Sequence, residues 1–241
     1  MSSGWIRADW PAPGGVLAGT TLRDSNFELP AEPQWLNQVH GANVVHAGTA
    51  DFDDGPPDAD AIIARKPGIC CAVRTADCLP VLLCSSQGTE IAAVHGGWRS
   101  LAAGIIENTI AAMSTQPTDI LAWFGPAISQ PAFEVGAEVR AAFLSADAGA
   151  GEAFAVNDRG RWQADLYKLA AQRLRSAGVS QVFGGGLCTH ADAARFYSYR
   201  RDGETGRMVS FIFKGRSPFG QKGSDPSRDT LENGVPDVIS G

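Results

Sequence analysis

The residues best suited to do chemistry are a cysteine and two histidines that stand where apolar runs end. His40 and His95 occur in near-identical contexts, VHGANV and VHGGW, where a glycine follows the imidazole and permits a sharp turn. Cys78 stands in TADCLP, between two apolar runs. Two neutral imidazoles and one thiolate suit zinc and leave a fourth position for water or substrate. Because the spacing matches no short zinc motif, capping histidines and a buried cysteine are an equal alternative.

The same residues also permit catalysis without a metal. Cys78 would be a nucleophile and His95 its general base, with Asp77 orienting or polarising the pair, as in cysteine hydrolases. Arg200, in FYSYRRDG, could hold an anion beside aromatic rings, or it could simply cover a tyrosine at a sheet edge. The acidic stretch 51–60 resembles a calcium loop only loosely and is expected to be a solvated loop.

Composition and charge define the class of protein. The chain has 241 residues, of which 44% are hydrophobic, enough for one large domain with a sizeable core. A net charge of −6 provides no attraction to nucleic acid or to an anionic membrane, so neither is an expected partner. Five cysteines, an odd number, and an N-terminus without a secretory pattern favour a reducing cytoplasm. A monomer or a homodimer is expected.

The elements that must position these residues are interleaved strands and helices. Unbroken apolar runs predict strands covered on both faces, at residues 68–75, 79–85 and 90–95. Helical spacing predicts helices at residues 100–113, capped by Ser100, at 133–144, and at 164–178, between Asp165 and Gly178. Residues 196–213 are expected to form a β-hairpin around a glycine-containing turn. Because several strands connect through tight turns, the predicted fold is α+β with mixed sheets.

One catalytic domain is expected over residues 1–213. Its first part, residues 1–34, is rich in proline, glycine and polar residues and predicts an irregular segment. Residues 214–241 lack a periodic apolar face and have the composition of a disordered tail.

Longer motifs resemble those of one protein family. They cover about residues 34–213 in order, and they read WLNQVHG, DADAIIA, TADCLPVLL, AAVHGGWRSLAAGII, GPAISQPAFEVGAEV and FYSYRRDGETGR. The chain is thereby similar to the laccase-domain or polyphenol oxidase family. Its members are described as purine nucleoside phosphorylases and, in one bacterial branch, as the peptidoglycan editing factor. The resemblance implies a layered α/β sandwich that is shared with cysteine hydrolases.

The resemblance also implies a ligand set and a reaction. The family's zinc-binding histidine in Q-V-H-G falls on His40, its cysteine in T-A-D-C on Cys78, and its histidine in H-A-G-W-R on His95. The implied reaction is phosphorolysis of adenosine, inosine and methylthioadenosine, with adenosine deamination in addition. The implied partners are therefore a nucleoside and phosphate. The editing branch implies instead the hydrolysis of an amide in a cell-wall precursor.

Roles for further residues follow as expectations. Asp77 is the candidate acid or base that protonates the leaving purine or takes a proton from water. Arg200 is the first candidate for binding phosphate, with Arg74 and Arg99 behind it. Copper-dependent phenol oxidation, also described for the family, is expected to be secondary. Four histidines cannot supply the sites of a multicopper laccase, although a single copper could occupy the same three ligands.

The sequence departs from the family pattern in two places. Gly96 stands where H-A-G-W-R has alanine, a change that should not alter ligation. The region before Trp35 is short, with TTLRDSNFELPAEPQ in place of a glycine-rich segment and a helix. If that segment covers the substrate in related chains, the substrate preference of this protein is expected to differ.

Overall fold

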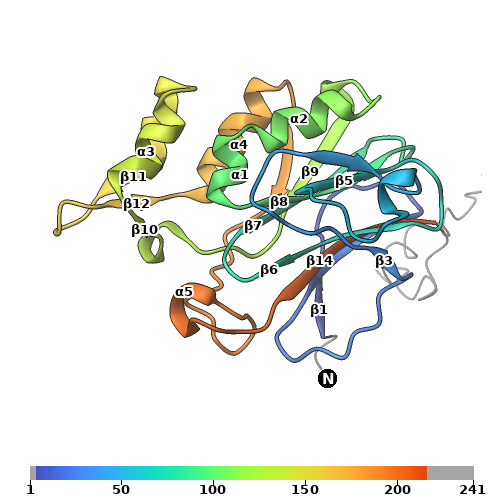
Figure 1. Cartoon of the computed structure of the whole chain (residues 1–241), viewed down its shortest axis with the longest axis horizontal. Helices are drawn as coiled ribbons and strands as arrows, with labels where there is room; N and C mark the ends of the chain where they lie inside the picture. The colour runs from blue at the N-terminus through green and yellow to red at the C-terminus, as the bar shows by residue number, and fades with distance from the viewer. Residues whose placement is uncertain (1–3, 216–241) are drawn as a thin grey trace, which may run out of the picture.

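The computed structural model describes residues 4–215, which form two β-sheets packed face to face, with helices on the far side of one of them (Figure 1). Across the larger sheet the strands are β13 (Gln181–Gly184), β9 (Ile120–Phe124), β7 (Leu79–Ser85), β8 (Ile91–Gly96), β5 (Ala61–Ala64) and β4 (Val44–His46). Across the second sheet they are β1 (Trp5–Arg7), β2 (Val16–Thr21), β14 (Met208–Lys214), β6 (Cys70–Thr75) and β3 (Pro33–Gln34). Both sheets contain parallel and antiparallel pairs, so the predicted α+β class with mixed sheets is confirmed.

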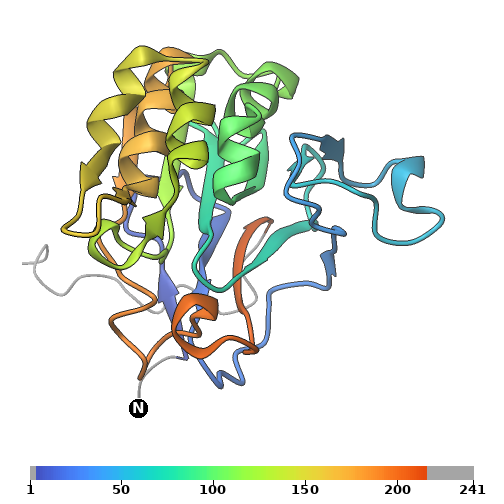
Figure 2. The same cartoon turned by 60° about the vertical axis from the view of Figure 1, so that its left-hand side comes forward.

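Three helices cover the outer face of the larger sheet, and a smaller unit lies beside them (Figure 2). The helices are α1 (Trp98–Ala102), α2 (Ile105–Ala112) and α4 (Leu166–Ser176). The smaller unit contains α3 (Ala137–Leu144) and a three-stranded sheet of β10 (Glu134–Val135), β12 (Trp162–Ala164) and β11 (Phe154–Val156). Short 3-10 turns lie at Ala50–Phe52, Pro117–Asp119, Gln130–Ala132 and Ala148–Ala153. None of the helices within residues 4–215 is long and apolar enough to cross a membrane.

The unbroken apolar runs of the central strands follow from this layering. Successive side chains of a strand point to opposite faces of the sheet. In β7, Val81 and Leu83 pack toward the helices, whereas Leu82 and Cys84 pack against the second sheet. Both faces of the strand are therefore buried, which is why no polar residue interrupts it.

The space between the two sheets changes character at one end. In β8 the face that carries Ala93 in the core also carries His95, two residues further along. In β6 the face that carries Val73 in the core also carries Thr75, at the last position of the strand. An apolar inter-sheet core therefore gives way to polar side chains at the ends of β8 and β6.

The expectation of an irregular segment over residues 1–34 is wrong in part. β1 and β2 form an antiparallel pair, and β2 also pairs with β14 over Val16 to Thr20. A hydrogen bond of 2.7 Å between the Thr20 and Ser210 hydroxyls joins the two strands. Thr20 and Ser210 lie 190 positions apart in sequence, so local composition could not reveal the pairing of β2 with β14.

The hairpin expected over residues 196–213 is also wrong. One strand, β14, is present, but the first half turns into a short helix, α5 (Tyr199–Asp202). Ser198 caps this helix because its hydroxyl accepts a hydrogen bond from the backbone N–H of Arg201. Gly203, with φ of 70°, ends it. Phe196 and Ser198 are both buried, as expected for alternate residues of a strand, but this pattern ends at Ser198, where the helix begins.

The predicted helices are confirmed with changes at their ends. Residues 100–113 form two helices, α1 and α2, because Gly104 adopts the left-handed conformation between them, with φ of 88°. Gly97, and not Ser100, is the N-cap of α1. Asp165 caps α4 as predicted, by accepting a hydrogen bond from the backbone N–H of Lys168. Of the predicted tail, Lys214 belongs to β14, and residues 216–241 lie outside the described residues.

Candidate active site

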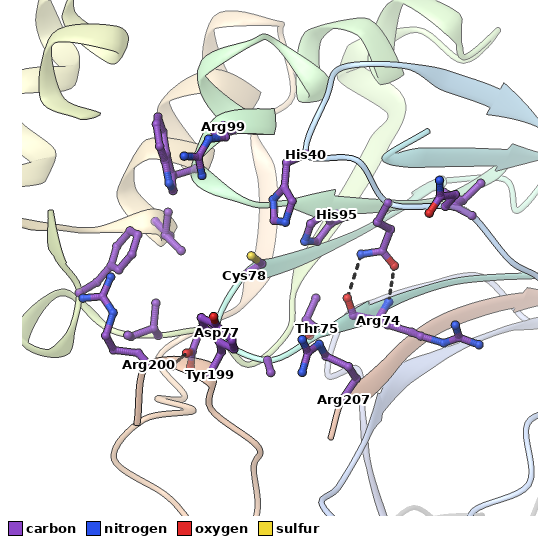
Figure 3. Close-up of a pocket in the computed structure, with 18 residues that line it drawn as sticks. His40, Arg74, Thr75, Asp77, Cys78, His95, Arg99, Tyr199, Arg200 and Arg207 are labelled. Carbon is purple, nitrogen blue, oxygen red and sulfur yellow. Dashed lines mark hydrogen bonds between the residues drawn. The ribbon is translucent and has the colours of Figure 1, made fainter. Parts of the chain in front are cut away.

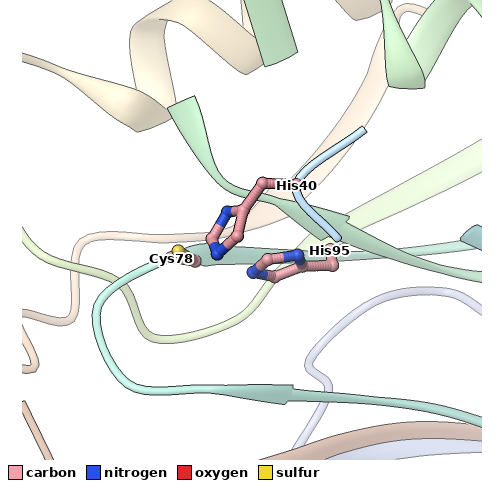
Figure 4. A group of neighbouring side chains, drawn as sticks. All are labelled: His40, Cys78 and His95. Atoms are coloured by element: carbon pink, nitrogen blue, oxygen red, sulfur yellow. The ribbon is translucent and has the colours of Figure 1, made fainter. Parts of the chain in front are cut away.

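His40, Cys78 and His95 lie together at the polar end of the inter-sheet space (Figure 4). One potential ligand atom from each residue lies within 4.8 Å of the others. Cys78 directly precedes β7, His95 lies near the end of the neighbouring β8, and His40 lies in the loop between β3 and β4. The structure thus brings together the three residues that the sequence singled out, from three separate chain segments.

The loop that carries His40 is held from both sides. Gln38 forms two hydrogen bonds with the backbone of Arg74, donating to its carbonyl oxygen at 2.9 Å and accepting from its N–H at 2.8 Å. On the other side, the Asp60 carboxylate accepts the backbone N–H groups of His40 at 3.1 Å and Gly41 at 2.6 Å. His40 itself adopts a left-handed conformation, with φ of 59°, which is uncommon for a residue with a side chain. These contacts explain the Gln of the QVHG motif.

Asp60 also orients His95. Its Oδ1 atom lies 2.7 Å from His95 Nδ1, so His95 Nε2 is the ring nitrogen that remains for the cluster. Histidines that bind metals usually make such a contact with a carboxylate, which sets the tautomer and the direction of the ring. Asp60 is fully buried, so the expectation of a solvated acidic loop is wrong at this position. Its place directly before the apolar strand β5 was the available sequence signal.

The surroundings affect the two imidazoles in opposite directions. Burial lowers the pKa of His95, but hydrogen bonds to Asp60 and Cys78 outweigh this effect and raise the pKa to about 9. Burial lowers the pKa of His40, and the nearby His95 lowers it further. A cation bound by the three residues would take the place of the proton at His95, with Asp60 still compensating its charge. One thiol, two imidazoles and a buried carboxylate behind one of them thus fit a zinc or copper ion.

The cluster leaves no space for a side chain at Gly97. A Cβ atom there would lie 2.7 Å from His40 Nδ1 and 3.3 Å from Cys78 Sγ. Gly97 has φ of −63° and ψ of 155°, values open to any residue, so backbone conformation does not demand glycine. The requirement for glycine is therefore steric and comes from the cluster itself.

A cavity of about 680 Å³ opens onto the cluster (Figure 3). Its lining includes apolar and aromatic side chains, among them Trp98, Ile128, Phe133, Leu166 and Tyr199. It also includes polar ones, among them Asn37, Gln38, Arg74, Thr75 and Arg207. Arg99 and Arg200 also line it, and Asp77 is the one acidic residue among the lining residues that the structure describes. Such a cavity suits a ligand with a planar apolar part and a negative charge.

Asp77 lies beside Cys78, but its carboxylate is occupied. Oδ1 accepts the Thr189 hydroxyl at 2.6 Å, while Oδ2 accepts the Ser198 hydroxyl at 3.0 Å and the backbone N–H of Arg200 at 2.7 Å. All three donors come from the protein itself, so a substrate would have to displace one of them to reach the carboxylate. This geometry argues against the acid or base role expected from the sequence and favours positioning of α5, which carries Tyr199 into the cavity wall.

The three arginines expected near phosphate occupy different places. Arg74 stacks on Trp35, with 3.8 Å from its guanidinium carbon to the ring centroid, and Figure 3 shows its side chain extending away from the cluster. Arg99 stacks on Trp98 at 4.4 Å. The remaining one, Arg200, donates to the carbonyl oxygen of residue 134 at 2.9 Å. A fourth arginine at the cavity, Arg207, was missed because the sequence placed it in a hairpin turn.

Comparison with known proteins identifies relatives over most of the chain. The family model described as "Multi-copper polyphenol oxidoreductase laccase" matches residues 14–214. A protein of Shigella flexneri named purine nucleoside phosphorylase YfiH is 52% identical over 185 residues, which are 77% of this chain and 75% of that protein. A purine nucleoside phosphorylase of Pseudomonas aeruginosa is 42% identical over 240 residues, covering 87% of this chain and 98% of its own length.

Solved structures share the architecture. The crystal structure of Neisseria meningitidis protein NMB0706 aligns with a TM-score of 0.82 and 41% identity, covering 88% of this chain and 99% of that one. YlmD from Geobacillus stearothermophilus aligns with a TM-score of 0.76 at 24% identity, a likeness that speaks for the fold alone.

Proposed function

This chain belongs to the multi-copper polyphenol oxidoreductase laccase family, and from that premise we propose that it is a zinc-dependent purine nucleoside phosphorylase. The observation that carries the proposal is a cluster of two histidines and one cysteine that opens onto a cavity lined by arginines and aromatic rings. The names of relatives at 52% and 42% identity support the reaction class. The proposed substrates are adenosine, inosine and methylthioadenosine, each with inorganic phosphate.

Phosphorolysis makes two demands that this cavity can meet. An oxygen of phosphate bonds to the anomeric carbon of the sugar while the bond from that carbon to the purine nitrogen breaks. The electron pair of the broken bond stays with the purine, which takes up a proton. Phosphate needs cationic partners, and arginines supply them with geometry suited to its oxygens. The purine needs an apolar surface, which Trp98, Phe133 and Tyr199 offer.

His40, Cys78 and His95 are the proposed zinc ligands, and the family description raises the question of copper. A multicopper oxidase requires several copper sites, and the whole chain contains four histidines. Two of them already belong to the cluster with Cys78. A bound zinc ion would supply Lewis acidity without redox chemistry. We therefore place phenol oxidation, through one copper in the same ligands, behind the phosphorylase.

The proposal extends to adenosine deamination, in which water adds at C6 of the purine and ammonia leaves. In both reactions, two carboxylates of this chain hold the residues of the site in position. Asp60 holds His95 and the His40 loop, and Asp77 holds the helix that carries Tyr199 and Arg200. Because the Asp77 carboxylate already accepts three hydrogen bonds, we assign it to the position of α5 and not to the transfer of the purine proton.

A second candidate function has one observation in its favour. Cys78, His95 and Asp60 stand in the order nucleophile, base and orienting carboxylate that cysteine hydrolases use. The sequence had suggested Asp77 for the third role. Hydrolysis of an amide in a cell-wall precursor would use this triad, whereas His40 would have no function in it. The presence of His40 in the cluster favours the metal.

The test is an assay of zinc-loaded protein with adenosine, with and without inorganic phosphate. Formation of ribose 1-phosphate that depends on phosphate is the expected result, whereas sugar release independent of phosphate would refute phosphorolysis. Cys78→Ala should lose zinc and turnover together. The matched control is Cys188→Ala, since Cys188 is also partly buried but does not line the cavity. Full zinc content in an inactive Cys78→Ala, with a substrate adduct trapped on Cys78 in the parent, would favour the hydrolase.

A further inference from the structure

The lining of the cavity contains a hydroxyl group that no atom of the described part of the chain satisfies. Thr75 is 1% exposed, and its Oγ1 atom has no hydrogen-bond partner among residues 4–215. Burying a hydroxyl without a partner costs free energy, so such groups in folded proteins call for an explanation. Thr75 lines the cavity, on the same inter-sheet face as the buried core of β6. A ligand in the cavity could therefore supply the missing partner.

The sheet register brings a cation to the same place. Thr75 pairs with Met208 across β6 and β14, and Arg207 directly precedes Met208. Cys78 follows Thr75 by three residues, a span of at most about 10 Å. Figure 3 shows Thr75 and Arg207 on one side of the cluster and Arg99 on the other. A hydroxyl donor and a guanidinium thus lie together within reach of the cluster.

The loop that presents Arg207 is well supported. Gly206 packs so closely on the Tyr197 ring that a Cβ atom would lie 2.6 Å from it. The Tyr197 hydroxyl in turn donates to the Asp24 carboxylate at 2.7 Å. Arg207 Nη1 donates to the carbonyl oxygens of Thr205 and Gly206, which leaves its Nη2 and Nε donors for another partner. Arg207 therefore lies at the cavity with two of its guanidinium nitrogens available to donate hydrogen bonds to a ligand.

Electrostatics at this position favour an anion. Arg74, the neighbour of Thr75 in β6, packs its guanidinium on Trp35 and adds positive potential from the outer face. The single acidic group among the described lining residues, Asp77, is already occupied by three hydrogen-bond donors. No free carboxylate among these lining residues would compete for Arg207.

We propose that Thr75 and Arg207 form an anion subsite that holds inorganic phosphate, on the side of the cluster opposite Arg99. The choice of phosphate as the anion rests on the proposed phosphorylase function. The Thr75 hydroxyl donates to one oxygen and the Arg207 guanidinium binds others, so that phosphate lies between the metal cluster and β14. Arg99 and Arg200 are then left to the nucleoside side of the cavity, which revises their expected role in phosphate binding.

Phosphate binding without nucleoside tests the subsite directly. Zinc-loaded full-length protein is titrated with inorganic phosphate in a calorimeter, and steady-state KM values for phosphate and adenosine are measured separately. Thr75→Val keeps the shape of the side chain and removes an unpaired hydroxyl, so the protein should melt at the same temperature or higher. Thr75→Val and Arg207→Gln should each weaken phosphate binding about tenfold or more, with KM for adenosine nearly unchanged.

Two matched controls separate the subsite from general effects. Ser100→Ala removes another buried hydroxyl that has no partner but does not line the cavity. Arg175→Gln removes an exposed arginine of α4 that is also remote from the lining. Both should bind phosphate like the parent. Parent-like phosphate binding in Thr75→Val and Arg207→Gln would overturn the subsite even if phosphorolysis occurs. Loss of binding in those two variants, in a protein without phosphorolysis, would support the subsite and refute the proposed function.

Discussion

Gly97→Ala is the sharpest steric test of the metal cluster, because it adds one methyl group and removes no ligand. The new Cβ atom would lie 2.7 Å from His40 Nδ1, whereas ordinary contact begins at 3.4 Å, so the imidazole must move by about 0.7 Å. Zinc tolerates deviations of only about 0.2 Å from its bond lengths of about 2.0–2.1 Å to nitrogen. Displacing a ligand in this way should weaken zinc binding about 10–100-fold, the range typical of altered support around a metal site.

The fold should survive this substitution. The backbone angles of Gly97 are open to alanine, and the atoms that must move belong to the cluster and not to the apolar core. The assay is competition for zinc with a chromophoric chelator, paired with a thermal melt of the metal-free protein. Gly14→Ala is the control, because a Cβ atom at Gly14 would meet nothing within 4 Å. If Gly97→Ala bound zinc as tightly as the parent, His40, Cys78 and His95 could not together be the zinc ligands.

Two further substitutions test the residues behind the cluster. Asp60→Asn should weaken zinc binding about 10–100-fold and destabilise the protein by about 1–3 kcal/mol. The reason is that an amide cannot accept hydrogen bonds from both the His95 ring and the Gly41 N–H. Unchanged zinc affinity in the same chelator assay would contradict this role of Asp60. Asp77→Asn should keep zinc and the pH profile of kcat while KM for adenosine rises, since α5 loses its anchor. A fall of about 10²–10⁴-fold in kcat, with loss of one limb of the pH profile, would instead restore Asp77 as an acid or base.

The local pattern of the chain was sufficient to predict the central strands and to single out three candidate residues at their ends. Runs such as residues 79–85 are apolar on both alternating faces, which follows from burial between two layers. Polar or reactive residue types are unusual at the ends of such apolar runs. Their presence there identified His40, Cys78 and His95 as candidate site residues. Chemistry of the residue types then suggested the metal, because histidine and cysteine are its preferred ligands.

The supporting residues of the site could not be predicted in the same way. Asp60 looked like part of a solvated acidic loop, yet it is fully buried and holds two segments of the cluster. Asp77 looked like a catalytic acid or base, yet its partners are Thr189, Ser198 and Arg200, more than 100 positions away. Whether a carboxylate is free or occupied depends on donors from distant segments.

The sequence alone determined which residues are buried in the central strands and which residue types end them, because both follow from side-chain chemistry and strand periodicity. The tertiary structure alone decided the pairing of β2 with β14, the helix that replaces the expected hairpin, and the place of Thr75 and Arg207 at one cavity. These features depend on packing between segments distant in sequence, where several local conformations are possible and the contacts made on folding select one.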